Sequence, residues 1–381
     1  MKIALVSPYD FSHPGGVGRH ITALYNIFIP MGHEVKVIAP ASREVNDFGE
    51  HFIRIGRPFP IPASDSIIRI SLSMHLAPTI KEVLAQEKFD IIHLHEPFMP
   101  MLCSAVLRFS NTVNVGTFHA AQGKPGYNWG RPITTWMLSR RARKLHGHIA
   151  VSKPAMDYVS QFVPGEYEII PNGVDLNHFR PDVQPLEQYT DGKLNIVFLS
   201  RLEYRKGANY LLKAFYEIKR QMPNTRLLIC GAGTRLRKRY EKWVKDVRLP
   251  DVVFTGMVPE QDIARYYKTA DIFCLPATSH ESFGLILLEA MATGRPIVAT
   301  NIEGFAAVVT HGEEGLLVPP MTVRPLTEAL LKLLNDKQLR LQMGQKGLVT
   351  AQKYDWEGIA ARLLAYYGNT IEKVNHNGAL R

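Results

Sequence analysis

Cysteine is scarce in this chain of 381 residues, which contains only three. They stand far apart in the sequence, and no two of them form a Cys-x-x-Cys pair. This spacing excludes a disulfide-stapled scaffold and the usual cysteine zinc sites. We expect Cys103, Cys230 and Cys274 to be buried free thiols of a protein in a reducing compartment, the cytoplasm.

Long apolar runs are missing as well. No stretch approaches the roughly 20 apolar residues that a helix needs to span a bilayer. The run at 3–6 is too short for the apolar core of a signal peptide, and Pro8 interrupts it. We therefore expect these residues to form a first buried strand.

Positive charge is in excess, with a formal net charge of +10. Nucleic acid, an anionic membrane surface and phosphorylated substrates all suit such a balance. No recognised nucleic-acid-binding motif is present, so we expect no nucleic-acid partner. Basic residues gather at 140–144 and at 235–245, where a solvated helix face is the plain alternative to a binding role.

Short apolar runs alternate with helical patterns, which is typical of βαβ units with a parallel sheet. A first set of strands is predicted at 2–7, 34–39, 90–95, 113–118 and 148–152, and a second at 195–200, 226–231, 252–255, 271–275, 296–300 and 315–318. Helices are predicted at 17–30, 78–87, 208–221, 236–247, 260–268, 285–292 and 326–334. Turn residues separate the two sets, and we place a hinge across 165–192. The predicted fold class is α/β, with two Rossmann-like domains at 1–170 and 171–355.

A glycine pair, Gly15 and Gly16, follows the first predicted strand and precedes a helix. Glycine lets the backbone approach a phosphate, and the start of a helix offers free N–H groups. The spacing is not that of Gly-x-Gly-x-x-Gly. A plain turn between strand and helix is therefore the alternative to a phosphate site.

Two cations, Arg201 and Lys206, follow the strand at 195–200 and open the next helix. Arginine can bind phosphate oxygens bidentately, and lysine acts as a point charge. Cations at a helix N-terminus oppose its dipole, which favours a bound anion such as a diphosphate. A solvated first turn is the alternative.

Two glutamates, Glu281 and Glu289, flank the start of a strongly apolar helix. A carboxylate on a buried helix needs donors, and a ribose diol supplies two. The N–H groups of Ser282, Phe283 and Gly284 are free at the helix start and could hold phosphate oxygens. The alternative is that neighbouring backbone caps Glu289.

His119 ends the apolar strand at 113–118. A histidine at that place can hydrogen-bond a sugar or transfer a proton. His93 and His95 on the preceding strand compete for this role, and a structural role is the alternative for each.

In this order, the four groups of residues resemble the GT-B-fold glycosyltransferases of the large retaining family that uses nucleotide-sugar donors (glycosyl transferase group 1, family 4). The stretches at 8–9, 14–17, 93–97, 116–119, 149–152 and 354–356 are similar to phosphatidyl-myo-inositol mannosyltransferases. The resemblance implies two Rossmann-like domains that face a central cleft. It also implies that a C-terminal helix of about 356–381 packs back on the first domain.

The resemblance assigns roles to the site residues. Gly15 and Gly16 approach the donor, Arg201 and Lys206 hold its diphosphate, Glu281 meets the hydroxyls of the transferred sugar, Glu289 meets the ribose, and His119 lies beside the reacting sugar. The leaving diphosphate helps to deprotonate the acceptor from the same face, and the anomeric configuration is retained. Because no Asp-x-Asp motif occurs, we expect neither a metal nor a cofactor.

Tyr9, Arg69 and Lys124 match the positions expected to bind the acceptor phosphate. Gly18 and Ala120 stand where the mannosyltransferases carry Gln and Thr. The expected reaction moves a hexose, with GDP-mannose favoured as donor, to a membrane lipid such as phosphatidylinositol. A UDP-sugar with a soluble or other glycolipid acceptor, and a GT-B sugar-nucleotide epimerase, are the alternatives.

Glu260 follows the strand at 252–255 and could accept hydrogen bonds from guanine N1 and N2, as an acid near this place does in the mannosyltransferases. The apolar stretch at 133–138, just before the basic cluster at 140–144, could lie at a lipid interface. The protein would then be peripheral on the inner face of the cell membrane. Packing of 133–138 into the core is the alternative.

Overall fold

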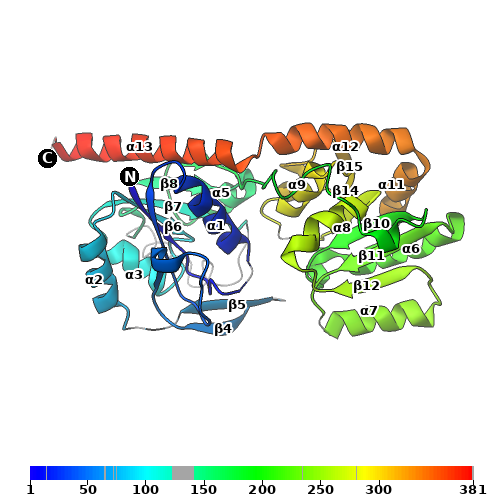
Figure 1. Cartoon of the computed structure of the whole chain (residues 1–381), viewed down its shortest axis with the longest axis horizontal. Coiled ribbons are helices and arrows are strands. Elements are labelled where there is room, and N and C mark those ends of the chain that lie inside the picture. The colour runs from blue at the N-terminus through cyan, green and yellow to red at the C-terminus, as the bar shows by residue number, and fades with distance from the viewer. Residues whose placement is uncertain are drawn as a thin grey trace. The chain divides into compact units, whose positions relative to one another are not determined.

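The computed structural model describes residues 1–13, 15–63, 66–71, 73, 75–121, 141–233, 235–279 and 281–379. The chain forms two compact units, which are coloured in chain order in Figure 1. The N-terminal unit comprises Met1–Gly173 and Trp356–Arg381, and the C-terminal unit comprises Val174–Asp355. Each is built on a parallel sheet with helices, as the α/β pattern of the sequence predicts.

The sheet of the N-terminal unit has seven parallel strands in the order β3-β2-β1-β6-β7-β8-β9. Its strands are β1 (Lys2–Val6), β2 (Glu34–Ala39), β3 (Phe52–Arg54), β6 (Ile91–His95), β7 (Val113–Phe118), β8 (Gly147–Ala150) and β9 (Tyr167–Ile169). The predicted strands lie close to five of these. The edge strands β3 and β9 were not predicted, because three residues are too few to form a pattern.

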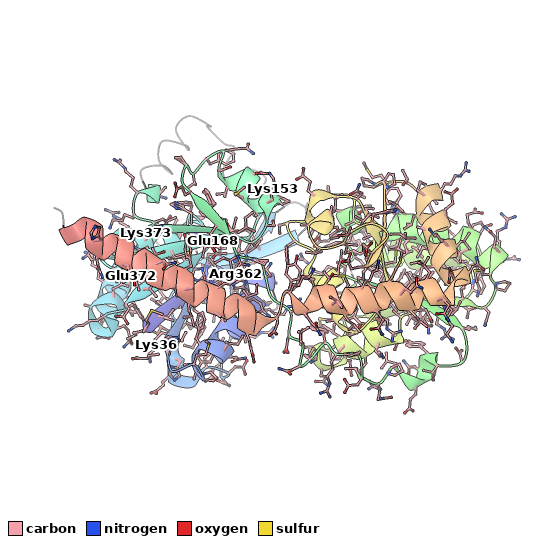
Figure 2. All side chains as sticks on the ribbon, turned by 90° about the horizontal axis from the view of Figure 1, so that it is seen from above. Lys36, Lys153, Glu168, Arg362, Glu372 and Lys373 are labelled. Carbon is pink, nitrogen blue, oxygen red and sulfur yellow. The ribbon has the colours of Figure 1, made fainter. Side chains whose placement is uncertain are left out.

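Helices cover both faces of this sheet. They are α1 (Gly16–Phe28), α2 (Ala77–Glu87), α3 (Leu102–Phe109), α5 (Lys153–Val159) and α13 (Trp356–Ala379). Along β1, Ile3 and Leu5 join the core under α1 and α13, whereas Ala4 and Val6 join the core under α2, α3 and α5. Figure 2 shows α13 along this unit, where Arg362 donates to the carbonyl of Ile169 on β9 at 3.0 Å.

A separate hairpin, β4 (Pro58–Ala63) and β5 (Ser66–Ser71), completes the N-terminal unit. Its first strand carries proline at every second position, 58, 60 and 62. Proline has no N–H, so the outer edge of β4 offers no donors at these positions to an added strand. The hairpin was not predicted, because the prolines weaken the strand pattern.

The sheet of the C-terminal unit has six parallel strands in the order β12-β11-β10-β13-β14-β15. They are β10 (Leu194–Leu199), β11 (Thr225–Cys230), β12 (Val252–Gly256), β13 (Ile272–Leu275), β14 (Ile297–Thr300) and β15 (Gly315–Val318). All six lie close to predicted strands, because strands buried on both faces are continuous apolar runs.

The helical elements of this unit are η2 (Glu187–Tyr189), η3 (Tyr204–Lys206), α6 (Ala208–Gln221), α7 (Arg235–Asp246), η4 (Glu260–Asp262), α8 (Ile263–Thr269), α9 (Leu285–Ala292), α10 (Glu303–Ala306), α11 (Arg324–Asn335) and α12 (Lys337–Gln352). The helix predicted at 260–268 is wrong in its start, because a 3₁₀ turn occupies 260–262. Helix α12 was not predicted. Its contact with α9 uses glycines, and a Cβ on Gly344 would lie 2.4 Å from the carbonyl oxygen of Gly294.

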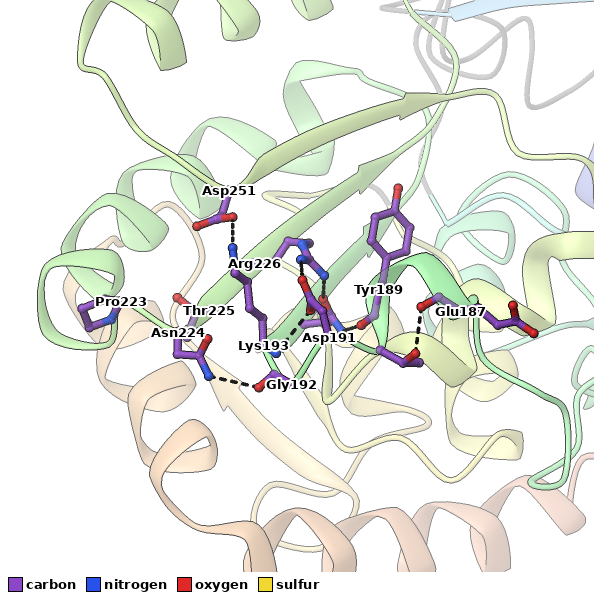
Figure 3. Close-up of polar contacts among 12 residues, drawn as sticks. Glu187, Tyr189, Asp191, Gly192, Lys193, Pro223, Asn224, Thr225, Arg226 and Asp251 are labelled. Carbon is purple, nitrogen blue, oxygen red and sulfur yellow. Dashed lines mark hydrogen bonds and ion pairs between the residues drawn. The ribbon is translucent and has the colours of Figure 1, made fainter.

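Ion pairs hold together the amino ends of the strands in the C-terminal unit (Figure 3). Arg226 on β11 pairs with Asp191, which precedes β10. Asp251, which precedes β12, accepts from Lys193 and Lys219. These charges therefore have a structural use at the edge opposite the carboxyl ends, where open α/β sheets bind ligands.

Two predictions concern the whole chain. Cys103, Cys230 and Cys274 are free and buried, as predicted. Among the described residues, no helix is long and apolar enough to cross a bilayer.

Candidate active site

Two loops that follow strands β10 and β13, at the ends of the strands where parallel sheets bind ligands, contact each other through one carboxylate. One Glu281 oxygen, Oε1, lies 2.6 Å from Lys206 Nζ and 2.6 Å from Arg205 Nη1. A backbone hydrogen bond joins the same two loops, since the amide of Thr278 donates to the carbonyl of Arg205 at 2.7 Å. The structure thus joins Lys206 and Glu281, which are widely separated in sequence.

The same loop holds a second carboxylate. Glu203 is buried and accepts from Arg205 Nε at 2.8 Å, and Arg201 Nη1 lies 3.1 Å from its other oxygen. Burial lowers the pKa of Lys206 below its usual value, although Glu281 opposes that shift. Three cations therefore face two carboxylates in this charged site (Arg201, Glu203, Arg205, Lys206 and Glu281). One positive charge is left in excess, which suits an anionic ligand.

Arg205 was not singled out from the sequence. The feature of the sequence that could have identified it is its position directly before Lys206, in a segment that must turn sharply. Gly207 makes this turn with a φ of +76°, and a Cβ there would lie 1.8 Å from the carbonyl oxygen of Pro276. Only glycine allows the two loops to approach this closely.

Glu289 lies on α9 and is buried, as expected from its apolar helix. Its Oε2 accepts from the hydroxyl of Tyr267, which is fully buried, at 2.7 Å. The sequence predicted that this buried carboxylate needs hydrogen-bond donors, and a tyrosine on α8 is one of them. The sequence offered no sign of this contact, because the two residues are on different helices.

The segment before α9 offers backbone donors. Within the described part of the chain, the N–H groups of Ser282, Phe283 and Gly284 donate no hydrogen bond. A Cβ on Gly304 would lie 2.0 Å from the carbonyl oxygen of Glu281, so α10 packs tightly under this segment. Glu260 is exposed and opens η4 after β12, at the same edge of the sheet.

Four histidines gather in the N-terminal unit (the histidine cluster: His20, His93, His95 and His119). His93 and His95 lie on β6, His119 directly follows β7, and His20 lies on α1. His95 Nδ1 lies 2.9 Å from His119 Nε2. His93 Nε2 lies 2.6 Å from the hydroxyl of Thr117, and its Nδ1 lies 2.6 Å from the hydroxyl of Tyr367 on α13. The structure therefore brings His119 together with both of its predicted competitors.

His20 on α1 was not singled out from the sequence. Its ring centroid lies 5.0 Å from that of His95, 5.1 Å from that of His119 and 4.9 Å from that of Trp356. Its Nδ1 lies 2.8 Å from Asn172 Oδ1. The available signal was its helical spacing from the buried Leu24, which places both on one face of α1.

Burial keeps the histidine cluster uncharged. It lowers the pKa of His20 to about 4, and it lowers the pKa of His93, His95 and His119 well below the ordinary value of 6.5. Desolvation disfavours the imidazolium form, and no carboxylate opposes that effect in these four groups.

Glu96 fixes the backbone at His119. This buried carboxylate accepts from the amides of His119 at 2.7 Å and Ala120 at 3.0 Å, and its own φ is +51°. Burial raises the pKa of Glu96, although the two amides oppose that shift. Glu96 was not predicted to serve the site.

The glycine pair and two acceptor residues also lie in the N-terminal unit. Gly15 and Gly16 are exposed at the start of α1, with open space where a Cβ would stand. Tyr9 bridges to Ile70 on β5, and the amide of Asp10 donates to the carbonyl of Arg69 at 2.9 Å. The backbones of Tyr9 and Arg69 are therefore neighbours.

Part of the predicted acceptor and membrane region falls outside the described residues, namely Lys124, the stretch 133–138 and Arg140. Arg141 and Arg143 are exposed. Lys144 has a structural use, since its Nζ donates to the carbonyls of Arg108 at 2.6 Å and Ser110 at 3.2 Å at the end of α3.

Two successive units, each built on a parallel sheet with helices, are the architecture of the GT-B fold. The fold is similar to that of sucrose-phosphate synthase from Thermosynechococcus elongatus, with a TM-score of 0.77, 22% identity and coverage of 98% of this chain and 99% of that one. Anabaena Alr3699/HepE in complex with UDP and glucose is also similar, with a TM-score of 0.74, 19% identity and coverage of 97% and 99%.

Family matches account for both units. Residues 14–178 match Glycosyltransferase Family 4, and residues 184–350 match Glycosyl transferases group 1. The phosphatidyl-myo-inositol mannosyltransferase of Mycobacterium leprae (strain TN) is 33% identical over 370 residues, which cover 96% of each chain. The chain therefore belongs to this glycosyltransferase family, the one that includes the phosphatidyl-myo-inositol mannosyltransferases.

Proposed function

We propose that this enzyme transfers mannose from GDP-mannose to phosphatidylinositol, with retention of configuration and without a metal ion. The observation that carries the proposal is the 33% identity over 96% of both chains to a protein named phosphatidyl-myo-inositol mannosyltransferase. In this proposal the enzyme works as a peripheral protein at the cytoplasmic face of the cell membrane. Its donor is a nucleotide sugar, and it needs no cofactor.

The charged site supplies the chemistry for the leaving group. Arg201 and Lys206 bind the diphosphate, and the excess positive charge of the site stabilises the negative charge that develops as the glycosidic bond breaks. The free N–H groups of Ser282, Phe283 and Gly284 add donors for phosphate oxygens. Because protein cations neutralise the diphosphate, the transfer should proceed in EDTA.

Glu281 and Glu289 bind hydroxyls in this proposal. A diphosphate at Lys206 competes with Glu281 for the same ammonium group. Donor binding would therefore remove one of the two cation contacts at Glu281 Oε1 and leave room for that oxygen to accept from a hydroxyl of the transferred sugar, while Arg205 stays paired with it. Glu289 accepts from the ribose diol. Glu260, exposed after β12, accepts from guanine, and GDP should therefore bind more tightly than UDP.

The N-terminal unit takes the acceptor. Tyr9 and Arg69, whose backbones are neighbours, bind its phosphate together with Lys124, and His119 lies beside the reacting sugar. Exposed basic residues such as Arg141 and Arg143 attract the unit to anionic lipid. The leaving diphosphate takes up the proton of the attacking hydroxyl.

The test is a transfer assay with the purified protein, radiolabelled GDP-mannose and vesicles that contain phosphatidylinositol. We expect a mannosylated lipid with the α-configuration of the donor by NMR, and equal yields with EDTA or Mg²⁺. Parallel reactions with UDP-glucose and soluble polyols test the alternative donor and acceptor. Transfer only from a UDP-sugar, or only to a soluble acceptor, would overturn this substrate assignment. Inverted product or a complete requirement for metal would overturn the mechanism.

A further inference from the structure

One hydrogen bond joins the rings of His95 and His119, and either ring could be its donor. The Nδ1 of His95 lies 2.9 Å from the Nε2 of His119, which is a hydrogen-bond distance. Burial lowers the pKa of both imidazoles, so both are neutral near pH 7. A neutral imidazole carries one N–H and one lone pair. Either His95 donates to His119, or His119 donates to His95.

The surroundings of His95 decide between these two arrangements. Its side chain is fully buried, and its other nitrogen, Nε2, has no hydrogen-bond partner among the described residues. If His119 were the donor, the proton of His95 would lie on this Nε2, as a buried N–H with no acceptor. If His95 is the donor, Nε2 is only a lone pair without a donor. A buried N–H without a partner is the rarer and costlier of the two.

The neighbouring His93 offers a contrast. Both of its nitrogens are engaged, one with Thr117 and the other with Tyr367, each at 2.6 Å. A hydroxyl can donate or accept, so His93 can take either tautomer without leaving a buried group unpaired. Of these two histidines, His95 has one nitrogen paired and the other buried without a partner among the described residues, and this asymmetry favours one tautomer over the other.

We propose that His95 is a positioning residue that holds His119 in the Nδ1–H tautomer, so that His119 offers its ligand a hydrogen-bond donor and no basic nitrogen. Nε2 of His119 is occupied by the N–H of His95, which leaves Nδ1–H as the polar group that can meet a ligand. Glu96 fixes the backbone of the same residue through two amides. His119 therefore donates to an oxygen of the sugar and does not remove a proton from it.

The tautomer itself does not depend on the reaction proposed above, whereas its use toward a sugar rests on that function. Two arms of one experiment keep these apart. The first measures the tautomer by NMR in the protein alone. The second measures transfer, with whichever donor the assay supports.

In the first arm, ring nitrogens of ¹⁵N-histidine-labelled protein are observed by long-range ¹H–¹⁵N correlation at pH 7.5. The resonances of His119 are identified by their loss in His119→Gln. We expect a protonated Nδ1 and an unprotonated Nε2 in His119, and a protonated Nδ1 in His95. A protonated Nε2, a charged ring or an average over both tautomers in His119 would overturn the proposal.

Two substitutions at His95 sharpen the result. Asparagine keeps a donor at the place of Nδ1, whereas leucine removes it. We expect His95→Asn to preserve the Nδ1–H tautomer of His119 and His95→Leu to release it to an average of both. His51→Asn is the matched control, since His51 contacts the carbonyl of Val35 at 3.1 Å, outside the cluster. If His95→Leu does not fold, the wild-type and His95→Asn spectra still decide the tautomer.

In the second arm, kcat/KM for the donor should fall about tenfold in His95→Leu, as is typical when the partner that orients a functional histidine is lost. His95→Asn should restore most of it, and thermal unfolding checks that both variants are folded. Equal activity in His95→Leu and wild type would overturn the positioning role. A protein that transfers no mannose but shows the expected tautomer would overturn the proposed function alone.

Discussion

The N-terminal unit gathers four neutral imidazoles around β6 and the end of β7, whereas the C-terminal unit gathers three cations and two carboxylates in the loops that follow its strands. The N-terminal histidines avoid charge through lowered pKa values, while the C-terminal residues keep charge by pairing.

This difference separates two kinds of ligand. A charged site with one cation in excess suits a phosphate-bearing group, which brings its own charge. An uncharged cluster of hydrogen-bonding rings suits a sugar, which brings hydroxyls and no charge. In the function proposed above, two sheets of the same type take different parts of one reaction because different side chains lie near the ends of their strands.

The largest expected effect comes from forcing the charged site apart. In Gly207→Ala, a methyl group must enter space beside the carbonyl of Pro276, at a positive φ. We expect the free energy of unfolding to fall by roughly 3 kcal/mol or more. The control is Gly312→Ala, where φ is +85° but nothing lies within 4 Å, and where about 1 kcal/mol is expected. Equal losses in denaturant unfolding would contradict the close approach of the two loops.

Removing one cation of the charged site should cost turnover rather than folding. We expect Lys206→Ala to lower kcat about 100-fold, because one contact to the leaving diphosphate is lost. Arg201→Ala should cost at least about tenfold. Lys238→Ala, on the exposed face of α7, is the control cation and should leave kcat unchanged. Near-normal turnover in both site variants would rule out this diphosphate site.

Acid should lower the free energy of unfolding of the N-terminal unit. The pKa of His20 is about 4 in the folded protein against an ordinary 6.5, so between these values the unfolded chain binds a proton that the folded chain does not. The free energy of unfolding is therefore unaffected above this window and falls as the pH drops through it. At pH 5 the loss from His20 alone is about 2 kcal/mol.

Denaturant unfolding at pH 7 and pH 5 measures this loss. His20→Asn should make the pH dependence less steep, because it removes one of the four histidines whose pKa burial lowers. His376→Asn, at an exposed histidine on α13, should leave it as in the wild type. A pH dependence that is the same in all three proteins would show that the cluster is charged or open to water.

The smallest effect concerns the membrane. Replacing Arg141 and Arg143 by Gln should weaken binding to anionic vesicles by about 1 kcal/mol for each charge, without changing nucleotide affinity. Lys144 is left intact, because it caps α3. Binding should also weaken with salt. Arg324→Gln on α11 is the control. A wild-type protein that ignores anionic vesicles at low salt and glycosylates a soluble acceptor well would exclude the lipid assignment.

The strands at the centre of both sheets could be predicted, because strands buried on both faces appear in the sequence as continuous apolar runs. The hairpin of β4 and β5 and the helix α12 could not. In β4, alternate prolines protect an edge and weaken the strand pattern at the same time. In α12, Gly344 and Gly347 provide close backbone contact with α9 in place of large apolar side chains.

The candidate site likewise contains residues that could be predicted from the sequence and contacts that could not. The sequence marks Lys206, Glu281 and His119 as residues near strand ends, where α/β sheets bind ligands. It does not show that Lys206 and Glu281 meet, since that contact depends on which strands are neighbours. The pairs His93–Tyr367 and Glu289–Tyr267 likewise depend on how separate helices dock.

The docking of α13 has a consequence for the order in which the protein matures. Trp356 and Tyr367 complete the histidine cluster, yet in the chain they follow the whole C-terminal unit. At ~5–20 residues per second, a ribosome needs on the order of 10 to 40 s to translate that unit. During this interval the nascent N-terminal unit exposes the apolar groove that α13 later fills, and a chaperone has time to bind it. A message cut short before codon 356 would yield two sheets but no finished histidine cluster.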